Sequence, residues 1–320
     1  MTPVGVIINP TSGRGRGKGR QLFQALQASP SPSVLVLLLD EFTSLASGLE
    51  NFAKSGVRDI FISSGDGTVQ AIQTWISESK AFPVLPRLCL LPHGTTNMTA
   101  ADLGFRRKGI SEQALFIANV TPRQTMHRRT LRIVNPKGGQ SQHGMFFGTG
   151  AIAEATRYCQ VAFNDRGLGG DFATFATLAG AIAKSLFRAP DRNDPARFDR
   201  PYPITVTSGA EVICSGEQLL MLATTLDKLI LGTRPFWGGA TGPVRVTTMP
   251  YPVPGIIRWL VPSLYGKEER SGPPGSASRA VTACSVSSDM PFVLDGEFYE
   301  PQAGVPLQIE AGPSFEYIVA

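Results

Sequence analysis

Residues 60–75 read IFISSGDGTVQAIQTW, and this stretch decides the fold of the N-terminal part of the chain. A β-branched and aromatic run leads into an aspartate flanked by glycines, and apolar residues at helical spacing follow. The pattern predicts a strand, a tight loop and a helix. Glycines let the backbone turn sharply and approach a ligand closely, and the N–H groups of a helix start favour an anion. We therefore expect a phosphate-binding loop here.

Asp66 carries the negative charge of this loop. Its carboxylate would repel a phosphate, so Asp66 is a candidate Mg²⁺ ligand or proton acceptor. An alternative of equal weight, from this segment alone, is an ordinary strand-to-helix turn with Asp66 as the N-cap. The helix is expected to bury Val69, Ile72, Trp75 and Ile76, which fall on one face.

The same order of strand, loop and helix occurs twice more in the N-terminal third of the chain. Residues 4–8 lead into NPTSG at 9–13, and residues 88–91 lead into PHGTTN at 92–97. The carboxyl ends of parallel strands lie along one edge of an open sheet, where ligands bind. We therefore expect the three loops to meet at one site.

Both of these further loops have a simpler interpretation. Residues 14–20 alternate glycine with Arg and Lys, and such a basic stretch taken alone is more often a solvated loop than a ligand site. Neither GxGxxG nor a Walker A sequence fits it, because Lys18 and Gly19 stand where those fingerprints need other residues. The polar residues 95–97 can equally cap the helix that follows them.

The pattern of apolar and polar residues changes near residue 122. Before it, strand and helix patterns alternate, which predicts a parallel sheet covered by helices on both faces. After it, short alternating runs separated by Pro and Gly predict an all-β domain, a sandwich. We therefore expect an α/β plus all-β protein, with an α/β domain of residues 1–122 and a β-sandwich of residues 123–320. The expected strands are Val4–Ile8, Val34–Leu39, Asp59–Ser63 and Leu88–Leu91, then Leu131–Val134, Ile204–Val206, Val212–Cys214, Gln218–Leu222, Val244–Thr248, Thr282–Val286 and Leu307–Glu310.

Composition excludes several classes of protein. No apolar run reaches the roughly 18 residues that a membrane-spanning helix needs, and the start of the chain lacks a signal region, so a cytoplasmic location is expected. The four cysteines are far apart in the sequence and read as buried thiols, with neither a zinc site nor disulfides expected. A net charge of +5 suits anionic phosphates or an anionic membrane surface, and nucleic acid is not an expected partner. The sequence leaves the oligomeric state open, a homodimer included.

Three motifs carry a resemblance to a known family. NPTSG at 9–13, SGDGT at 64–68 and LPHGTTN at 91–97 together resemble the diacylglycerol kinase catalytic-domain family, which includes bacterial soluble lipid kinases and the sphingosine and ceramide kinases. Residues 294–297, LDGE, resemble the late DGE motif of that family, so the resemblance spans the chain. The more distant NAD kinases share a GGDGT-like loop, but LPxGTxN before a small-residue helix favours the lipid kinases.

The chain departs from the family pattern at three places. Ser64 stands where many relatives have glycine, and Met98 replaces an acidic residue that often follows the asparagine. Where many relatives have an aspartate in a DLG-like strand, this chain reads MHRRTL at 126–131. These departures affect the expected substrate more than the expected phosphoryl transfer.

The resemblance implies an ATP- and Mg²⁺-dependent lipid kinase. Asp66 would be the base that takes the proton of the attacking hydroxyl, and Asp295 and Glu297 would complete the catalytic site from the second domain, with Asp295 as a Mg²⁺ ligand. An alternative for Asp295-Gly296 is a β-hairpin turn, since Asp-Gly is a strong hairpin signal. The resemblance also implies that phosphate and nucleotide contacts come from Asn9, Ser12, Gly13, Gly65, Gly67, Thr68, Gly94, Thr95 and Asn97.

The acceptor is expected to be a lipid alcohol, with diacylglycerol first and sphingoid bases or ceramides as alternatives. Two apolar stretches with basic residues nearby, Phe172–Phe187 and Ile256–Leu264, are expected to be helical inserts in the β-sandwich domain, which is expected to bind the lipid. They are either core or contacts with an anionic membrane. The membrane alternative implies transient contact with the inner face of the membrane, and the resemblance also implies a role in phospholipid biosynthesis. Two other functions stay open at this point: a nucleotide-binding regulator without turnover, and a soluble-substrate kinase akin to NAD kinase.

Overall fold

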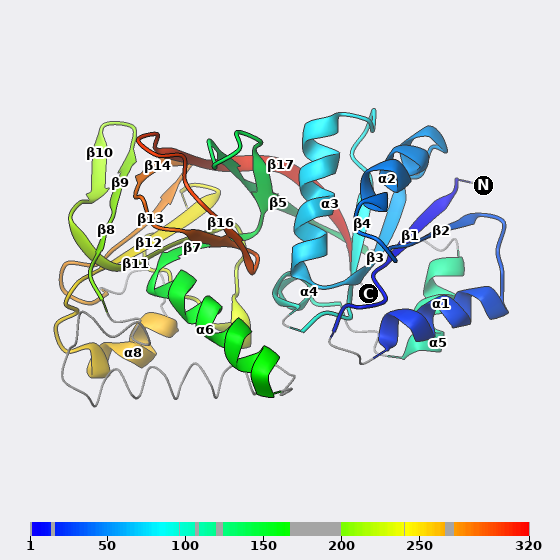
Figure 1. The fold of residues 1–320 in the computed structure, drawn as a ribbon, viewed down its shortest axis with the longest axis horizontal. Coiled ribbons are helices and arrows are strands. Elements are labelled where there is room, and N and C mark those ends of the chain that lie inside the picture. Colours follow the sequence, from blue (N-terminus) through cyan, green and yellow to red (C-terminus); the bar gives the residue numbers. More distant parts are fainter. Residues whose placement is uncertain are drawn as a thin grey trace. The chain divides into compact units, whose positions relative to one another are not determined.

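The computed structural model describes residues 2–13, 17–95, 97–105, 109–119, 124–166, 200–239, 241–265 and 272–319. The chain forms two compact units (Figure 1). Unit 1 comprises Met1–Arg128 and Pro313–Ala320, and unit 2 comprises Arg129–Gly312. Two long strands, β5 (Gln124–Val134) and β17 (Leu307–Val319), have residues in both units. The change of sequence pattern near residue 122 did not predict that the last residues of the chain return to unit 1.

Unit 1 is built on a parallel sheet. Its strands lie in the order β4-β3-β1-β2, and the end of β17 pairs parallel with β4 at Tyr317 and Leu88. Strands covered on both faces need continuous apolar runs, and the residues of β1 and β3 are buried without interruption. The predicted parallel sheet is confirmed. The four strands that open the chain are β1 (Val4–Ile8), β2 (Val34–Leu38), β3 (Asp59–Ser64) and β4 (Arg87–Pro92).

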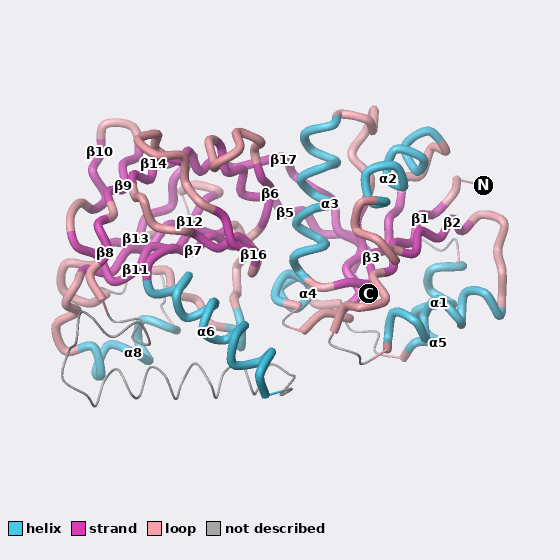
Figure 2. The backbone as a smooth tube through the Cα atoms, viewed as in Figure 1, coloured by secondary structure: helices cyan, strands magenta, loops and turns pink. Residues whose placement is uncertain are grey.

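Helices cover both faces of this sheet (Figures 1 and 2). On one face, Leu22 of α1 and Ile117 of α5 are buried in one cluster with Val6 and Phe61 of the strands. On the other face α2 lies so close that a Cβ on Gly5 would be 2.6 Å from the Phe52 ring. The helices of unit 1 are α1 (Lys18–Ala28), α2 (Ser44–Lys54), α3 (Asp66–Ser79), α4 (Met98–Leu103) and α5 (Ile110–Ala118).

The buried face of α3 differs in part from the prediction. Val69, Ile72 and Ile76 are buried as expected, but Trp75 is only partly buried and lies edge-on against Phe82, with ring centroids 6.4 Å apart. A polar side chain is buried instead. Gln73 is fully buried, and its Nε2 donates a hydrogen bond of 2.6 Å to the hydroxyl of Tyr317 in β17. A pattern of apolar residues cannot predict this bond, because the side chain of Gln73 is polar.

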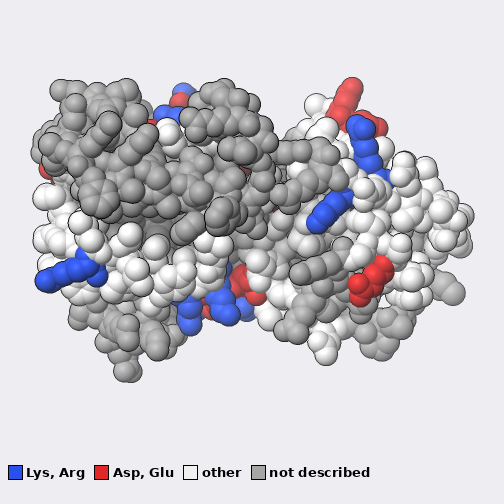
Figure 3. Space-filling model, turned by 90° about the horizontal axis from the view of Figure 1, so that it is seen from below, with Lys and Arg blue, Asp and Glu red and all other residues white. Residues whose placement is uncertain are grey.

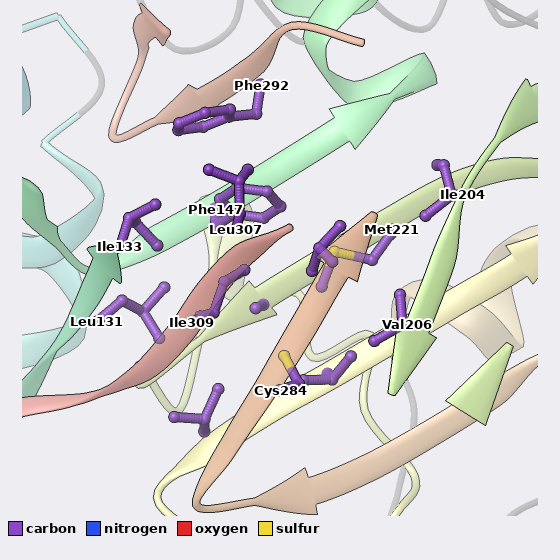
Figure 4. Packing of buried hydrophobic residues seen from close by; sticks show 14 of the residues in the cluster. Leu131, Ile133, Phe147, Ile204, Val206, Met221, Cys284, Phe292, Leu307 and Ile309 are labelled. Atoms are coloured by element: carbon purple, nitrogen blue, oxygen red, sulfur yellow. The ribbon is translucent and has the colours of Figure 1, made fainter. Parts of the chain in front are cut away.

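Unit 2 is a β-sandwich, as predicted. One sheet contains β10-β9-β14 and the first part of β17, together with β5 and β6, and the other has the order β13-β12-β11-β7-β15-β16, with β8 against β11. Buried side chains of both sheets share one core, which includes Leu131, Ile309, Phe147 and Met221 (Figure 4). The remaining strands of unit 2 are β6 (Gln142–Gly144), β7 (Phe146–Gly150), β8 (Tyr202–Pro203), β9 (Thr205–Ser208), β10 (Glu211–Cys214), β11 (Glu217–Thr224), β12 (Val244–Pro250), β13 (Ala277–Val281), β14 (Ala283–Ser287), β15 (Phe292–Leu294) and β16 (Glu297–Tyr299).

Among the described residues of unit 2, two helices and a short 3₁₀ turn, η1 (Ile230–Gly232), interrupt the strands. The helix α6 (Ala151–Arg166) was not predicted, because its small and polar residues form no clear apolar stripe. It contacts the β15-β16 hairpin through a hydrogen bond of 2.9 Å from Gln160 Nε2 to the Gly296 carbonyl. The helix α8 (Ile256–Leu264) matches the predicted range, whereas the predicted helix Phe172–Phe187 lies outside the described residues.

Two further expectations concern cysteines and membrane spans. All four cysteines are free thiols, and Cys89, Cys159 and Cys284 are buried. Burial is the main cause that raises the pKa of the Cys284 thiol, to about 12. Within the described ranges, no helix combines the length and the apolar character needed to cross a bilayer.

Asp295 occupies a two-residue hairpin turn. Leu294 pairs with Glu297, so only Asp295 and Gly296 lie between β15 and β16, with φ angles of 49° and 93°. Positive φ at both central residues defines a type I′ turn, which confirms the hairpin alternative for this motif. The carboxylate accepts hydrogen bonds from the N–H groups of Met145 at 2.8 Å and Phe146 at 2.9 Å. Asp295 therefore ties the hairpin to the start of β7.

Replacing Asp295 by Ala should destabilise the protein by about 3 kcal/mol. The substitution leaves the N–H groups of Met145 and Phe146 without this charged acceptor in a buried place, and bonds to charged groups contribute more than neutral ones. Urea denaturation measures the change in the free energy of unfolding.

Glu297→Gln on the same hairpin is the matched control. Glu297 is exposed, so this variant should unfold at the same urea concentration as the unchanged protein. Equal stability of the Asp295→Ala variant and the control would contradict the structural role of Asp295.

Candidate nucleotide site in unit 1

Three loops meet at the carboxyl ends of β1, β3 and β4. A Cβ on Gly94 would lie 2.4 Å from the Cα of Gly65, and a Cβ on Gly13 would lie 2.4 Å from the carbonyl oxygen of His93. Gly13 also has a φ of 73°, in the left-handed region that favours glycine. These loops touch backbone to backbone, which only glycine permits. The predicted convergence of the three loops is therefore seen in the structure.

Asn9 holds the first loop against the start of α3. Its Nδ2 donates a hydrogen bond of 3.2 Å to Thr68 Oγ1, and its Oδ1 accepts bonds from the N–H and the hydroxyl of Thr11 at 3.1 and 2.8 Å. The Oγ of Ser12 lies 3.4 Å from the place that a Cβ on Gly65 would take. The structure thus brings five predicted residues together, Asn9, Ser12, Gly13, Gly65 and Thr68.

Asn97 shapes the third loop. Its Oδ1 accepts the N–H of Gly94 at 2.7 Å, and its Nδ2 donates to the Gly94 carbonyl at 2.9 Å. Asn97 occupies the N-cap position of α4 with a φ of 49° but makes no side-chain cap bond. The capping interpretation is therefore wrong for this side chain, which closes the loop on Gly94 instead. Thr95 is partly buried in the same turn, and Thr96 lies outside the described residues.

Asp66 is the first residue of α3, because Gly65 is the N-cap. The alternative that made Asp66 the N-cap is therefore wrong. Its Oδ2 accepts a hydrogen bond of 3.2 Å from the N–H of Met98, which opens α4. A carboxylate is favoured in the first turn of a helix. Asp66 thus lies between the N-termini of α3 and α4, beside the glycine loops, and Gly67 follows it in the same turn.

Two residues of this region were not among the predicted site residues. His93 bonds through Nδ1 to the Ser63 hydroxyl at 2.8 Å. Burial, and then the charge of Lys18, lower the pKa of His93 to about 4, while a hydrogen bond with Gln113 opposes the shift. His93 is therefore neutral at pH 7, and Lys18 places its charge near this edge of the sheet.

A signal for Lys18 was present in the sequence. Lys18 begins the helix that follows the first loop, a position where a cation can reach a phosphate, but the surrounding basic stretch read as solvated. Arg14 and Arg16, from the same stretch, lie outside the described residues. His93 read only as a turn residue in PHGTTN.

Asp295 and Glu297 belong to unit 2 and the loops above to unit 1, so their catalytic roles stay predictions. No three His, Cys, Asp or Glu side chains of the described residues gather into a metal site. Mg²⁺ is often held by one or two carboxylates together with substrate phosphates, and Asp66 beside the glycine loops fits that arrangement. Both oxygens of Asp295 accept backbone N–H groups, which gives this carboxylate a structural role.

The chain matches a known family over part of its length. Residues 3–126, less than half of the chain, match the sequence model of the diacylglycerol kinase catalytic domain. The resemblance carried by the motifs is confirmed. The matched domain is that of a kinase family, and it includes the three loops and the helices that follow them.

Solved structures extend the likeness to the whole fold. Two solved structures described as putative diacylglycerol kinases from Bacillus anthracis strain Sterne each have 18% identity and a TM-score of 0.67, covering 99% of this chain and 97% of theirs. A third, described as a diacylglycerol kinase of the same strain, has 18% identity, a TM-score of 0.64 and the same coverage. At this identity the likeness concerns the fold, including the β-sandwich. A comparison with curated proteins gives no match.

Gly94→Ala should destabilise unit 1 by about 3 kcal/mol and weaken nucleotide binding at least about tenfold. The added methyl group would overlap the Gly65 backbone, which cannot rotate away as a side chain could. Thermal unfolding and titration with ATP measure the two effects.

Gly65→Ala tests the same contact from its other side. Its Cβ would meet Ser12 Oγ at 3.4 Å and Gly94 Cα at 3.5 Å, which are ordinary contacts, so the cost should not exceed about 1 kcal/mol. Similar losses of stability in the two variants would contradict the packing described for these loops.

His93 should make the protein less stable as the pH falls from 6.5 to about 4. The unfolded chain protonates this imidazole below about pH 6.5, whereas the fold lowers its pKa to about 4 and excludes the proton over that window. Stability should therefore decrease by roughly 3 kcal/mol across it. His93→Asn, which can keep a bond to Ser63, should remove this part of the acid loss in urea titrations at several pH values.

His127→Asn controls for the replacement of an imidazole by an amide. His127 is exposed on β5, so this variant should unfold at pH 7 at the same urea concentration as the unchanged protein. If His93→Asn keeps the acid loss of the unchanged protein, the buried neutral His93 is refuted.

Proposed function

We propose that this protein is an ATP-dependent kinase that transfers the γ-phosphoryl group to the hydroxyl of a lipid alcohol, with diacylglycerol as the first candidate acceptor. The observation that carries the proposal is the backbone contact of Gly65 with Gly94 beside Asp66, within the domain that matches the diacylglycerol kinase family. Main-chain N–H groups of these loops lie where the strand ends meet, and the carboxylate of Asp66 lies beside them.

The triphosphate of ATP would be held mainly by the backbone. The first N–H groups of a helix have no partner within it, and α3 presents those of Asp66, Gly67 and Thr68 at the loop edge. Lys18 at the start of α1 adds a positive charge, and Asn9 fixes the first loop to Thr68. Positioning and cancellation of charge are the main demands of phosphoryl transfer, and these groups supply both.

Asp66 would accept the proton of the attacking alcohol. As the alcohol oxygen bonds to the γ-phosphorus, the bond to the β–γ bridging oxygen breaks, and ADP leaves with that electron pair. The hydroxyl proton passes to Asp66 and then to water. The Met98 N–H bond orients the Asp66 carboxylate. Mg²⁺, when bound with ATP, would be held mainly by phosphate oxygens and would neutralise their charge.

The proposal also gives the reaction a place in the cell. A lipid alcohol resides in a bilayer, and ATP is supplied from the cytoplasm, so the enzyme would work at the inner face of the membrane. The product is a lipid phosphate, the kind of compound that phospholipid biosynthesis consumes.

Asp66→Asn should lower turnover at least about 100-fold while the affinity for ATP changes little, because the variant keeps the shape of the loop but loses the base. The assay combines labelled ATP, Mg²⁺ and a panel of lipid alcohols, with NAD as a soluble acceptor, and isothermal titration measures ATP binding.

Asp40→Asn is the matched control. Asp40 has the same side chain as Asp66, is exposed, and follows the carboxyl end of β2. The Asp40→Asn variant should therefore leave turnover unchanged. Tight ATP binding without product from any acceptor would favour a regulator, and labelled NADP would favour a soluble-substrate kinase. Full lipid phosphorylation by Asp66→Asn would contradict the assignment of the base.

A further inference from the structure

The helix α8 of unit 2 turns apolar side chains outward. All of its residues except Arg258 and Ser263 are apolar, yet Ser263 is its only buried residue. Ile257 and Val261, one turn apart, are each 64% exposed, and Tyr265 after the helix is 49% exposed. The interpretation of Ile256–Leu264 as core is therefore wrong. A helix on the surface of a globular protein ordinarily shows the opposite pattern, with its polar face toward the solvent.

A second element beside α8 has the same character. Ile230 and Leu231 of the η1 turn are 39% and 50% exposed, and Leu231 has a φ of 56°, which is unfavourable for a residue with a side chain. Hydrogen bonds from Leu229 N–H to the Thr233 carbonyl at 2.8 Å, and from Thr233 N–H to the Ile230 carbonyl at 3.1 Å, close the turn. This tight turn holds two large apolar side chains at its tip.

The turn and the helix are joined. Arg234, next to the turn, donates its N–H to the Leu264 carbonyl at 2.7 Å and forms a β-bridge with Tyr265. We call Ile230, Leu231, Ile257, Val261 and Tyr265 the apolar rim. These five are among the 11 large apolar side chains that the described residues expose, so almost half of that exposure is concentrated in two joined elements. Exposed apolar side chains gathered in this way mark an interaction surface.

The charges of the two segments select the kind of partner. Residues 228–239 and 251–265 contain Lys228, Arg234 and Arg258 and no Asp or Glu. Arg258 lies over the ring of Trp259, 5.6 Å from its centroid. Cations, Trp and Tyr beside exposed aliphatic side chains are the composition of a segment that lies in the interface of an anionic bilayer.

On the face in Figure 3 the described Lys and Arg side chains lie in small separate groups, with acidic groups among them. We therefore expect binding to a membrane to use insertion of apolar side chains, with the three cations of the two segments at the headgroups.

We propose that the apolar rim docks unit 2 on an anionic lipid bilayer, with its aliphatic side chains at the acyl boundary and Lys228, Arg234 and Arg258 at the headgroups. The purpose of this docking rests on the proposed function, because a lipid kinase must reach an acceptor that stays in the membrane. The docking itself depends only on the exposure and charge of the two elements.

The test is co-sedimentation of the full chain with vesicles of phosphatidylglycerol and phosphatidylcholine. The double variant Ile257→Ser/Val261→Ser should lower the vesicle affinity at least about tenfold, and Leu231→Ser should lower it independently, since each removes exposed aliphatic surface. Arg258→Gln should weaken binding to anionic vesicles and reduce its dependence on salt. All these side chains are exposed, so the variants should fold, and thermal unfolding checks this.

Val212→Ser is the matched control. Val212 on β10 is 61% exposed, nearly as much as Ile257 and Val261, but it lies outside the apolar rim. It should leave vesicle binding unchanged. Unchanged binding in the rim variants, an equal loss in the control, or rim-dependent dimerisation without vesicle binding would each overturn the proposal.

A kinase assay separates this inference from the proposed function. With a short-chain, water-soluble diacylglycerol the rim variants should keep full turnover, and with a long-chain acceptor in vesicles they should lose about tenfold. Rim-dependent vesicle binding by a protein that phosphorylates no lipid would uphold the docking surface and refute the lipid kinase. If the rim variants still phosphorylate vesicle lipid at the full rate, the lipid kinase is supported and the docking surface is refuted.

Discussion

The candidate site depends on one steric constraint, the contact of two backbones at Gly65 and Gly94. Gly94 has no room for a side chain, since its Cβ would lie 2.4 Å from the Gly65 Cα. Asn97 closes its loop on the carbonyl and N–H of Gly94, and Asp66 bonds to the N–H of Met98 that follows Asn97. Each neighbouring group therefore takes its position from this contact. The parallel sheet below supplies strand ends rigid enough to maintain it.

The Asp295-Gly296 motif of unit 2 has a structural role that does not depend on any catalytic one. Asp295 needs its positive φ to form the hairpin turn and needs both carboxylate oxygens to hold the N–H groups of Met145 and Phe146. These demands alone are enough to favour Asp-Gly at this place. A role for the same carboxylate in binding Mg²⁺ would be an addition to this structural one. The apolar rim differs from this motif, because exposing its apolar side chains to water does not stabilise the fold.

Much of the candidate site could be predicted, because glycine and small polar residues at strand ends have few other uses. The loops at Gly13, Gly65 and Gly94 follow from that reasoning. The burial of His93 could not be predicted, and Lys18 was missed although it opens the helix after the first loop. A lone histidine or lysine has no periodicity, and its significance comes only from the groups that surround it. The bond of Asn97 to Gly94 was missed for a related reason, since a capping position suits the same side chain.

The sequence by itself determined the local structure: the parallel strands of unit 1 to within a residue, the presence of helices after them, and the Asp295-Gly296 turn. Apolar runs, helical spacing and turn chemistry are local properties, so they can be read from adjacent residues. Only the tertiary structure decided that the last strand returns to pair Tyr317 with Leu88, that Gln73 is buried against Tyr317, and that α8 is exposed. A pattern shows which side chains favour burial, but the partner that buries them, or its absence, lies far away in the sequence.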